Sequence, residues 1–476
     1  MKKVMSLASG TTVVLVIAIL MSPGQTGAIP SFARKYETSC QTCHVAYPKL
    51  TPFGEAFRQN GFQWPGDIEN EEANIKDEQV ELGAEAYKRV FPRAVWPGAI
   101  PGKVPISFRA RTGFTWEKHE VENHSAFQQP TLQLLTGGTL GDNVGFFIGA
   151  HLFEEGRIDR GSVDRFYLKL NNLFSGRLPD HSLYVRVGQF IPEMVTFASN
   201  HRGLTLSSYA FNTYSPAAGP EFAAGHVHGG GDGQDEEEEG HVHGETESLV
   251  GPQFGIEFFQ LGIEASGILG HRFRYVAGLV NGGTGEENNA SKDGYFRLAY
   301  KIGGMGYDGT GGAGTTGRNW VDNSLALGLF GYRGFQFNQE TSLNTNLEIQ
   351  RLGLDFNGFL GSLNLYGGYL RGKDQVLKPH GDGHIHDTGT ETDQEFEIEA
   401  TVFDLVFAEA NYLLFPWLVG VLRFEQATPR EFGTIRRIVP SVTILYRANI
   451  KFIVESTFNP DDPNLNTLQV GLDFAY

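Results

Sequence analysis

Cysteine is almost absent from this sequence: its 476 residues contain two, Cys40 and Cys43, and both stand in one short run. Long apolar runs are equally scarce, because no stretch beyond residue 28 approaches the roughly 20 uncharged apolar residues of a membrane-spanning helix. Helical membrane spans are therefore not expected. Basic residues number 38 against 55 acidic ones, for a formal net charge of −17. This balance argues against nucleic acid as a partner and favours cations or a basic protein.

The two cysteines belong to the run Cys40-Gln41-Thr42-Cys43-His44, which has the form C-x-x-C-H. This spacing allows each thiol to add to one vinyl group of a haem, and the imidazole that follows can reach the iron. A local disulfide or a thioredoxin-like dithiol would use the same cysteines. Neither needs His44, however, and no strand–helix–strand pattern surrounds the pair. The run therefore predicts one covalently attached haem c, with His44 as an axial ligand of its iron.

The N-terminus has the features of an export signal. Lys2 and Lys3 precede an apolar run from Val13 to Met21, and small residues follow up to Ala28. Residues 1–28 are therefore predicted to be a signal peptide, removed before Ile29. Export agrees with the haem motif, because c-type haem is normally attached outside the cytoplasm.

Residues 29–64 are predicted to form a small α-helical cytochrome c module. Thr51 is a suitable helix N-cap with Pro52 at the first helical position, and Asn60-Gly61 is a suitable stop. On the resulting short helix, Phe53, Ala56 and Phe57 share one face. This face would lie either against the porphyrin or against a neighbouring element. So short a module cannot build a core alone, so another part of the chain is expected to cover the haem.

Residues 65–102 are acidic and then proline-rich, and this composition predicts a linker. From residue 103 to 476, segments of about ten residues alternate with period 2 and are separated by turn residues. The last segment is the clearest, because one set of side chains is apolar and the set between them is small or polar. The apolar set is Leu468, Val470, Leu472, Phe474 and Tyr476.

Alternation also occurs in water-soluble sandwiches, and three observations favour a membrane barrel instead. The chain ends in Gly471-x-x-Phe474-x-Tyr476, like the terminal strand of bacterial outer-membrane barrels, and the segments number about 16. The connections also sort by length: short ones would face the periplasm, and the two long charged ones, residues 191–251 and 372–397, would face outward. The Gly-rich stretch 303–320 would be a long inner turn, which leaves the strand count open by one hairpin. The predicted fold is an all-β, porin-like antiparallel barrel in the bacterial outer membrane.

The two long connections are rich in histidine and carboxylates. Imidazole and carboxylate together are a usual ligand set for borderline divalent metals, although acidic low-complexity loops also serve as solvated spacers. No spacing here defines a rigid site. The candidate ligands for extracellular metal capture are His226, His228, His241, His243, His380, His384 and His386.

Around the haem motif the sequence resembles a known family. The matching positions are Pro30-Ser-Phe-Ala-Arg-Lys-Tyr36, Cys43-His44, Pro48-x-Leu50, Phe53-Gly54, Phe57 and Asn60-Gly61-Phe62. They resemble the opening of the fused monohaem cytochrome–porin family, the outer-membrane ferrous iron oxidases of iron-oxidising bacteria. The resemblance is dense over about 35 residues and architectural over the rest. It implies a single haem c presented to a porin lumen, which carries electrons from iron at the cell surface to a soluble periplasmic c-type cytochrome.

The second axial ligand of the iron is not evident from the sequence. No methionine lies between Ile29 and Pro65, and beyond them the chain has only Met194 and Met305. Barrel residues could complete the coordination, and the predicted topology places two candidates near the inner rim and five towards the outer side. They are His181 and His271, and His119, His124, His151, His201 and Met194.

Three functions are compatible with these features. The first is electron transfer of the iron-to-cytochrome c oxidoreductase type, from extracellular ferrous iron to a periplasmic carrier. The second is a metal-uptake porin whose His-rich loops collect metal and whose haem-bearing segment is a plug or gate. The third is electron flow in the outward direction, to an extracellular acceptor.

Overall fold

The computed structural model describes the following residues: 31–36, 38–65, 79–82, 85–93, 99–102, 105–118, 123–141, 143–153, 163–197, 203–216, 251–252, 254–282, 291–311, 320–338, 345–380, 395–429 and 433–476. Among them, no helix has the length and apolar character that crossing a bilayer requires. The predicted signal peptide lies outside the described residues.

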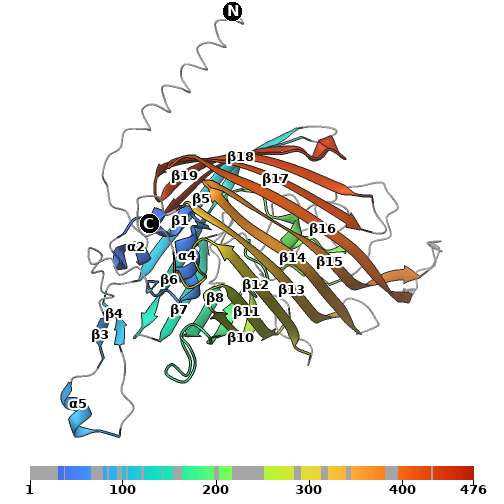
Figure 1. Cartoon of the computed structure of the whole chain (residues 1–476). Helices are drawn as coiled ribbons and strands as arrows, with labels where there is room; N and C mark the ends of the chain where they lie inside the picture. Colours follow the sequence, from blue (N-terminus) through green and yellow to red (C-terminus); the bar gives the residue numbers. More distant parts are fainter. Residues whose placement is uncertain are drawn as a thin grey trace, which may run out of the picture.

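Sixteen antiparallel strands form a closed barrel within the described part of the chain (Figure 1). Each strand pairs with its neighbours in sequence, and the last pairs with the first, with Thr467 opposite Glu117 and Ala475 opposite Arg109. Closure leaves no free edge of unpaired backbone groups. The strands are β5 (Ile106–Glu117), β6 (His124–Leu140), β7 (Val144–Phe153), β8 (Val163–Leu170), β9 (Tyr184–Phe190), β10 (Gln260–Leu269), β11 (Phe273–Val280), β12 (Asp293–Gly303), β13 (Asp322–Asn338), β14 (Thr345–Gly361), β15 (Leu363–His380), β16 (Glu395–Phe415), β17 (Leu418–Pro429), β18 (Ile435–Arg447), β19 (Ile450–Thr457) and β20 (Thr467–Ala475).

The alternating segments place apolar side chains on the outside of this barrel and polar ones inside. On β20, Leu468 and Val470 are about 40% exposed, whereas Gln469 and Asp473 are buried. In β14, likewise, Leu354 points outward and Asp355 inward. This is the reverse of a water-soluble sandwich and the arrangement of an outer-membrane barrel. The predicted fold class is confirmed, with about 16 strands and a small N-terminal helical region.

Short turns gather at one end of the barrel, here called the short-turn end. They include residues 270–272, 362, 416–417 and 448–449, and the C-terminus lies at the same end (Figure 1). Strands β9 and β15 end, and β10 and β16 begin, at the opposite end, here called the loop end, so both long connections start and finish there, as the sorting by length predicts. The second connection is shorter than the predicted 372–397, because residues 372–380 belong to β15 and residues 395–397 to β16. Of the predicted inner turn 303–320, residue 303 ends β12, and residues 304–311 and 320 lie between β12 and β13 at the short-turn end, outside any strand, so the strand count needs no correction.

The N-terminal helical region consists of α2 (Ser31–Lys35), α3 (Cys40–Cys43), β1 (His44–Ala46), β2 (Lys49–Leu50) and α4 (Pro52–Gln59). The predicted helix is confirmed as α4. The Thr51 hydroxyl accepts a hydrogen bond from Gly54 N at 3.0 Å, as an N-cap does, and Asn60 ends the helix. Gly61 follows with φ of +66°, which glycine adopts at little cost.

This helical region lies inside the short-turn end of the barrel, in contact with several strands (Figure 1). Ser31 N donates to Ser107 Oγ on β5 at 2.8 Å, and Lys169 on β8 donates to the Gln59 carbonyl at 2.5 Å. Residues 304–311, which follow β12, also contact it, because Asn60 Nδ2 donates to the Asp308 carbonyl at 3.2 Å. The barrel wall thus supplies the cover that a module of this size lacks.

Between the helical region and the barrel strands, the predicted linker contains a small antiparallel pair and one helix. The elements are β3 (Gln79–Glu81), α5 (Glu85–Val90) and β4 (Ala99–Pro101). A short 3₁₀ helix, η2 (Pro463–Leu465), precedes β20.

The connection between β9 and β10 turns back into the barrel. Residues 191–197 and 203–216, here called the lumen segment, include α7 (Ala210–Thr213) and fully buried Leu204 and Tyr209. Inward-facing carboxylates hold its backbone: Leu206 N donates to Glu455 and Ala210 N to Glu425, both at 2.7 Å. Buried backbone donors need such partners. The lumen of the barrel is therefore occupied by the chain itself.

Candidate functional site

The C-x-x-C-H run is held against the start of α4. Ser39 Oγ accepts a hydrogen bond from Gln41 N at the start of α3, and the chain becomes extended at His44. The Cys43 carbonyl accepts a bond from Thr51 N at 2.9 Å, and the Thr42 carbonyl accepts one from Thr51 Oγ1 at 3.0 Å. The turn that carries both thiols and the imidazole is thus fixed by backbone contacts.

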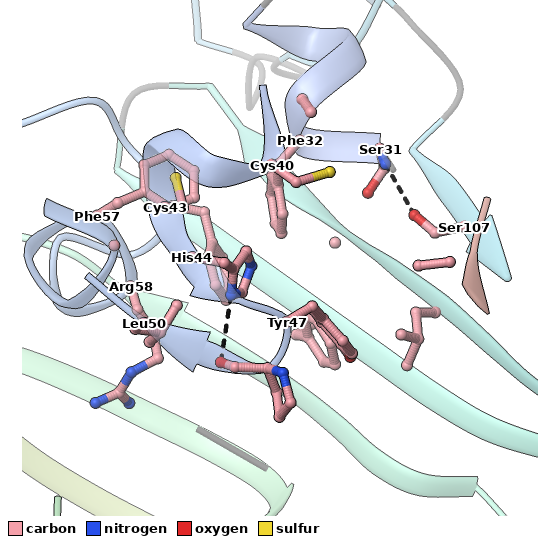
Figure 2. A pocket seen from close by; sticks show the side chains of 18 of the residues that line it. Ser31, Phe32, Cys40, Cys43, His44, Tyr47, Leu50, Phe57, Arg58 and Ser107 are labelled. Carbon is pink, nitrogen blue, oxygen red and sulfur yellow. Dashed lines mark hydrogen bonds between the residues drawn. The ribbon is translucent and has the colours of Figure 1, made fainter. Parts of the chain in front are cut away.

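Cys40, Cys43 and His44 all line one cavity between the helical region and the barrel wall (Figure 2). Its empty space is about 1480 Å³, counting the open mouth. The walls are largely apolar and aromatic, with side chains from both the helical region and the barrel. They include Phe32, Tyr36, Phe57, Phe147, Tyr167 and Phe190.

The helix α4 faces this cavity with Gly54, Phe57 and Arg58. Phe53 instead packs against Trp64, with ring centroids 4.8 Å apart. The predicted apolar face is therefore divided: Phe57 lines the cavity, as the porphyrin-facing alternative expects, and Phe53 packs against a neighbouring element.

The imidazole of His44 is held in one tautomer. Its Nδ1 lies 3.2 Å from the carbonyl oxygen of Pro48, which can only accept, so Nδ1 carries the proton and Nε2 keeps its lone pair (Figure 2). Burial lowers the pKa of His44 to about 4. A neutral imidazole, with the other ring nitrogen bound to a carbonyl, is the form that ligates metals in proteins.

The thiols differ from those of a redox dithiol. Both cysteines are free, and burial raises the pKa of Cys40 to about 11 and that of Cys43 to about 12. Thioredoxin-like sites depend instead on a lowered thiol pKa. Two thiols, a neutral imidazole and flat aromatic walls around one cavity are residues that could hold a covalently attached haem.

The candidates for a second axial ligand lie elsewhere. His181 and His271 are at the short-turn end, as predicted, but they contact Tyr184 OH and Asp308 respectively. Among the described residues that line the cavity, His44 is the only histidine, and none is a methionine. Of the remaining candidates, His124 begins β6 at the loop end, His151 lies 3.3 Å from Asp164, Met194 is buried in the lumen segment, and His119 and His201 lie outside the described residues.

The histidines predicted to capture metal cannot be placed in this structure. His226, His228, His241, His243, His384 and His386 lie outside the described residues, and His380 is described only as the backbone end of β15. In the part of the chain that is described, no group of three or more His, Cys, Asp or Glu side chains could hold a metal ion.

A set of charged residues lies beside the cavity, and none of them is among the predicted site residues. Arg58 donates to Glu193 of the lumen segment, Arg274 lies 2.6 Å from the same carboxylate, and Arg186 lies 2.7 Å from Glu264. Arg186 belongs to the inward face of an alternating strand, so the period-2 pattern could have placed it in the lumen. Its partners come from distant parts of the chain, and no local pattern indicates them.

Beyond the cavity, the lumen is filled by a cluster of buried aromatic side chains. Phe197 packs against Phe407 with centroids 4.4 Å apart, and Tyr209 OH lies 2.6 Å from Tyr366 OH. Both Phe197 and Tyr209 come from the lumen segment, and Phe407 and Tyr366 from the barrel wall. This packing leaves little space for solutes across the middle of the barrel.

Solved porin structures resemble the chain in fold. An anion-selective porin from Comamonas acidovorans aligns with 79% of this chain and 99% of its own length, at 11% identity and a TM-score of 0.50. OmpF of Salmonella typhi, in complex with daunomycin, aligns over 79% and 98%, at 10% identity and a TM-score of 0.48. No protein-family model and no curated protein matches the sequence. The chain thus has a closed 16-stranded antiparallel barrel that resembles the porins, with a small N-terminal helical region.

Proposed function

We propose that the chain is an outer-membrane electron-transfer protein, which oxidises extracellular ferrous iron through one c-type haem and passes the electrons to a periplasmic c-type cytochrome. One observation carries this proposal: two thiols and an imidazole meet at a single apolar cavity inside the end of a porin-like barrel.

The polarity of the barrel supports a place in the bacterial outer membrane. Leu352 and Leu354 on β14 are 57% and 56% exposed on its outside, whereas Arg351 and Asp355 are buried inside. Outer-membrane barrels have this apolar outer band, and their short turns face the periplasm. The helical region at the short-turn end would then lie where an exported soluble electron carrier can reach it.

Each residue of the site has a distinct role in this proposal. Cys40 and Cys43 would hold the haem through thioether bonds, and His44 would ligate its iron through Nε2, oriented by the carbonyl of Pro48. When bound, the haem supplies a centre that accepts and releases one electron. Phe57 and Tyr167 line the cavity and would limit the access of water to the haem. Carboxylate and imidazole side chains of the outer connections would collect ferrous iron.

The filled lumen favours electron transfer over solute transport. A metal-uptake porin needs a path for hydrated ions, whereas the lumen segment and the cluster around Phe407 occupy the middle of the barrel. Electrons need no such opening. Electron flow in the outward direction would use the same residues and is distinguished by the donor, not by the site.

Anaerobic stopped-flow absorbance tests the proposal. The oxidised protein in detergent is mixed with ferrous iron near neutral pH, and we expect the sharp bands of reduced haem c to appear. Replacement of His44 by alanine should abolish this reaction, and Cys40→Ser/Cys43→Ser should contain no covalent haem. If the haem stays oxidised with ferrous iron while dithionite reduces it, the iron reaction is wrong and another donor is required.

A further inference from the structure

Three arginines line the cavity beside the haem motif: Arg58, Arg165 and Arg186. Two of them already have carboxylate partners. Arg58 is bonded to Glu55 at 3.2 Å and to Glu193, and Arg186 is bonded to Glu264 at 2.7 Å. The charges of Arg58 and Arg186 are thus balanced within the protein. The third guanidinium, that of Arg165, differs from them.

Arg165, on β8, has no hydrogen-bonded carboxylate partner among the described residues. Its nearest carboxylate is that of Asp164 at 3.9 Å, beyond hydrogen-bond distance, and Asp164 also lies 3.3 Å from His151. The buried Nε–H of Arg165 has no acceptor among the described residues. The Arg165 side chain is 16% exposed, and its guanidinium stands over the rings of Phe147 and Phe259, 5.3 and 5.4 Å from their centroids. A mostly buried cation without a hydrogen-bonded anion is costly, so this position suits an anionic ligand.

The cavity also restricts what kind of anion would reach Arg165. Its walls are aromatic and apolar, so the ligand must carry its charge on a large apolar body. Guanidinium groups bind carboxylates through paired N–H donors. A haem has this combination, because two propionate carboxylates stand on the side of the macrocycle opposite the vinyl groups that form thioethers.

We propose that Arg165 binds a haem propionate. This assignment rests on the proposed function, because it requires the haem. Cys40 and Cys43 belong to the helical region, whereas Arg165 belongs to the barrel wall. The two sides of the haem would therefore be held by different parts of the chain, and the cofactor would tie the helical region to the barrel. Arg165 is a positioning residue and also adds positive charge near the iron.

Removal of the Arg165 charge should change the midpoint potential of the haem in a definite direction. A cation beside the haem disfavours the ferric state, which carries one more positive charge than the ferrous state. We therefore expect Arg165→Gln to lower the midpoint potential and to shift the propionate bands in the resonance Raman spectrum. Arg165→Lys keeps the charge but offers a single ammonium, so it should restore the potential while its propionate bands stay shifted. Arg177→Gln, an exposed arginine outside the cavity, is the control and should match the wild type in both.

The experiment separates this assignment from the proposed function. Covalent haem is first quantified by the pyridine haemochrome spectrum of each variant. If the wild type contains no covalent haem, the proposed function and the assignment both fail. If haem is present and Arg165→Gln has wild-type propionate bands, with or without a change in potential, the assignment alone is wrong. If Arg165→Gln does not fold, Arg165→Lys provides the test. Unshifted propionate bands in Arg165→Lys would also overturn the assignment of Arg165 to a propionate.

Discussion

A Cβ atom placed on Gly54 would lie 2.0 Å from the carbonyl oxygen of Cys43. Helix α4 therefore packs backbone to backbone against α3, next to the second thiol and directly before His44. The same carbonyl accepts a hydrogen bond from Thr51 N, so neither element can withdraw without losing that bond. The position of the haem motif depends on the absence of a side chain at residue 54.

Replacement of Gly54 by alanine should displace this turn. Overpacking of a well-packed contact costs about 1–3 kcal/mol, and here the added Cβ would meet a backbone carbonyl that cannot rotate away as a side chain can. We expect less covalent haem per protein, measured by the pyridine haemochrome spectrum, and a lower unfolding temperature. The matched control is Gly433→Ala, because a Cβ at Gly433 meets no atom within 4 Å. Equal haem content in the two variants would contradict the prediction.

The ion pair between Arg58 and Glu193 joins the helical region to the lumen segment. Burial raises the pKa of Glu193, but the charges of Arg274, Arg58 and Arg186 outweigh it and hold this pKa well below its ordinary value of 4.5. We expect Glu193→Gln to cost about 3–5 kcal/mol at neutral pH, because it removes the carboxylate paired with buried Arg274 and one of the two paired with Arg58. The measurement is the free energy of unfolding in urea.

The pH dependence of this effect has a predictable sign. A carboxyl whose pKa is lowered by folding stabilises the protein fully above its unfolded pKa and loses that contribution as the pH falls. The difference in the free energy of unfolding between the wild type and Glu193→Gln should therefore shrink below about pH 4.5. Glu348→Gln is the control: its partner Arg333 is 68% exposed, so its cost should stay within about 1 kcal/mol. A difference that is constant from pH 7 to pH 3 would show that the charge of Glu193 is not responsible.

Two leucines of similar exposure test the membrane location of the barrel. Leu354 lies midway along the outside of β14 and is 56% exposed, and Leu82, beside β3, is 52% exposed. An arginine on the lipid face near the bilayer midplane costs about 2–4 kcal/mol, whereas an arginine in water costs almost nothing. We expect Leu354→Arg to reduce folding into lipid vesicles, measured by the mobility shift of folded barrels on gels, and Leu82→Arg to fold like the wild type. Equal folding of the two variants would place both sites in water.

Local patterns predicted the elements of this fold, and long-range contacts decided what fills it. The period-2 alternation of Leu468 to Tyr476 predicts a barrel strand, and the Thr51 cap predicts α4, because both signals lie within a few residues. The inward course of the lumen segment has no such signal. It depends on pairs such as Tyr209 with Tyr366 and Ala210 with Glu425, whose members lie far apart in the sequence. The role of Arg165 is of the same kind, since it follows from the cavity and not from neighbours in sequence.

The lumen segment should keep the barrel closed to ions. Phe197, Tyr209 and Phe211 from this segment pack among buried aromatics of the wall, so the wild-type protein in a planar bilayer should show little conductance. Deletion of residues 203–216 removes Tyr209 and Phe211 and should produce open channels, because inward-facing charges such as Arg423 and Glu425 would then line a wetted lumen.

The control for this deletion removes an equal number of residues from 221–234 of the same connection, and it should leave the conductance low. High conductance in the wild type would contradict the closed lumen and favour the uptake porin. Haem reduction by ferrous iron gives an independent comparison. The control deletion also removes His226 and His228, so it should slow this reaction without abolishing it, whether or not the barrel conducts ions. A protein that conducts ions and does not reduce its haem would reverse the preference between the two functions.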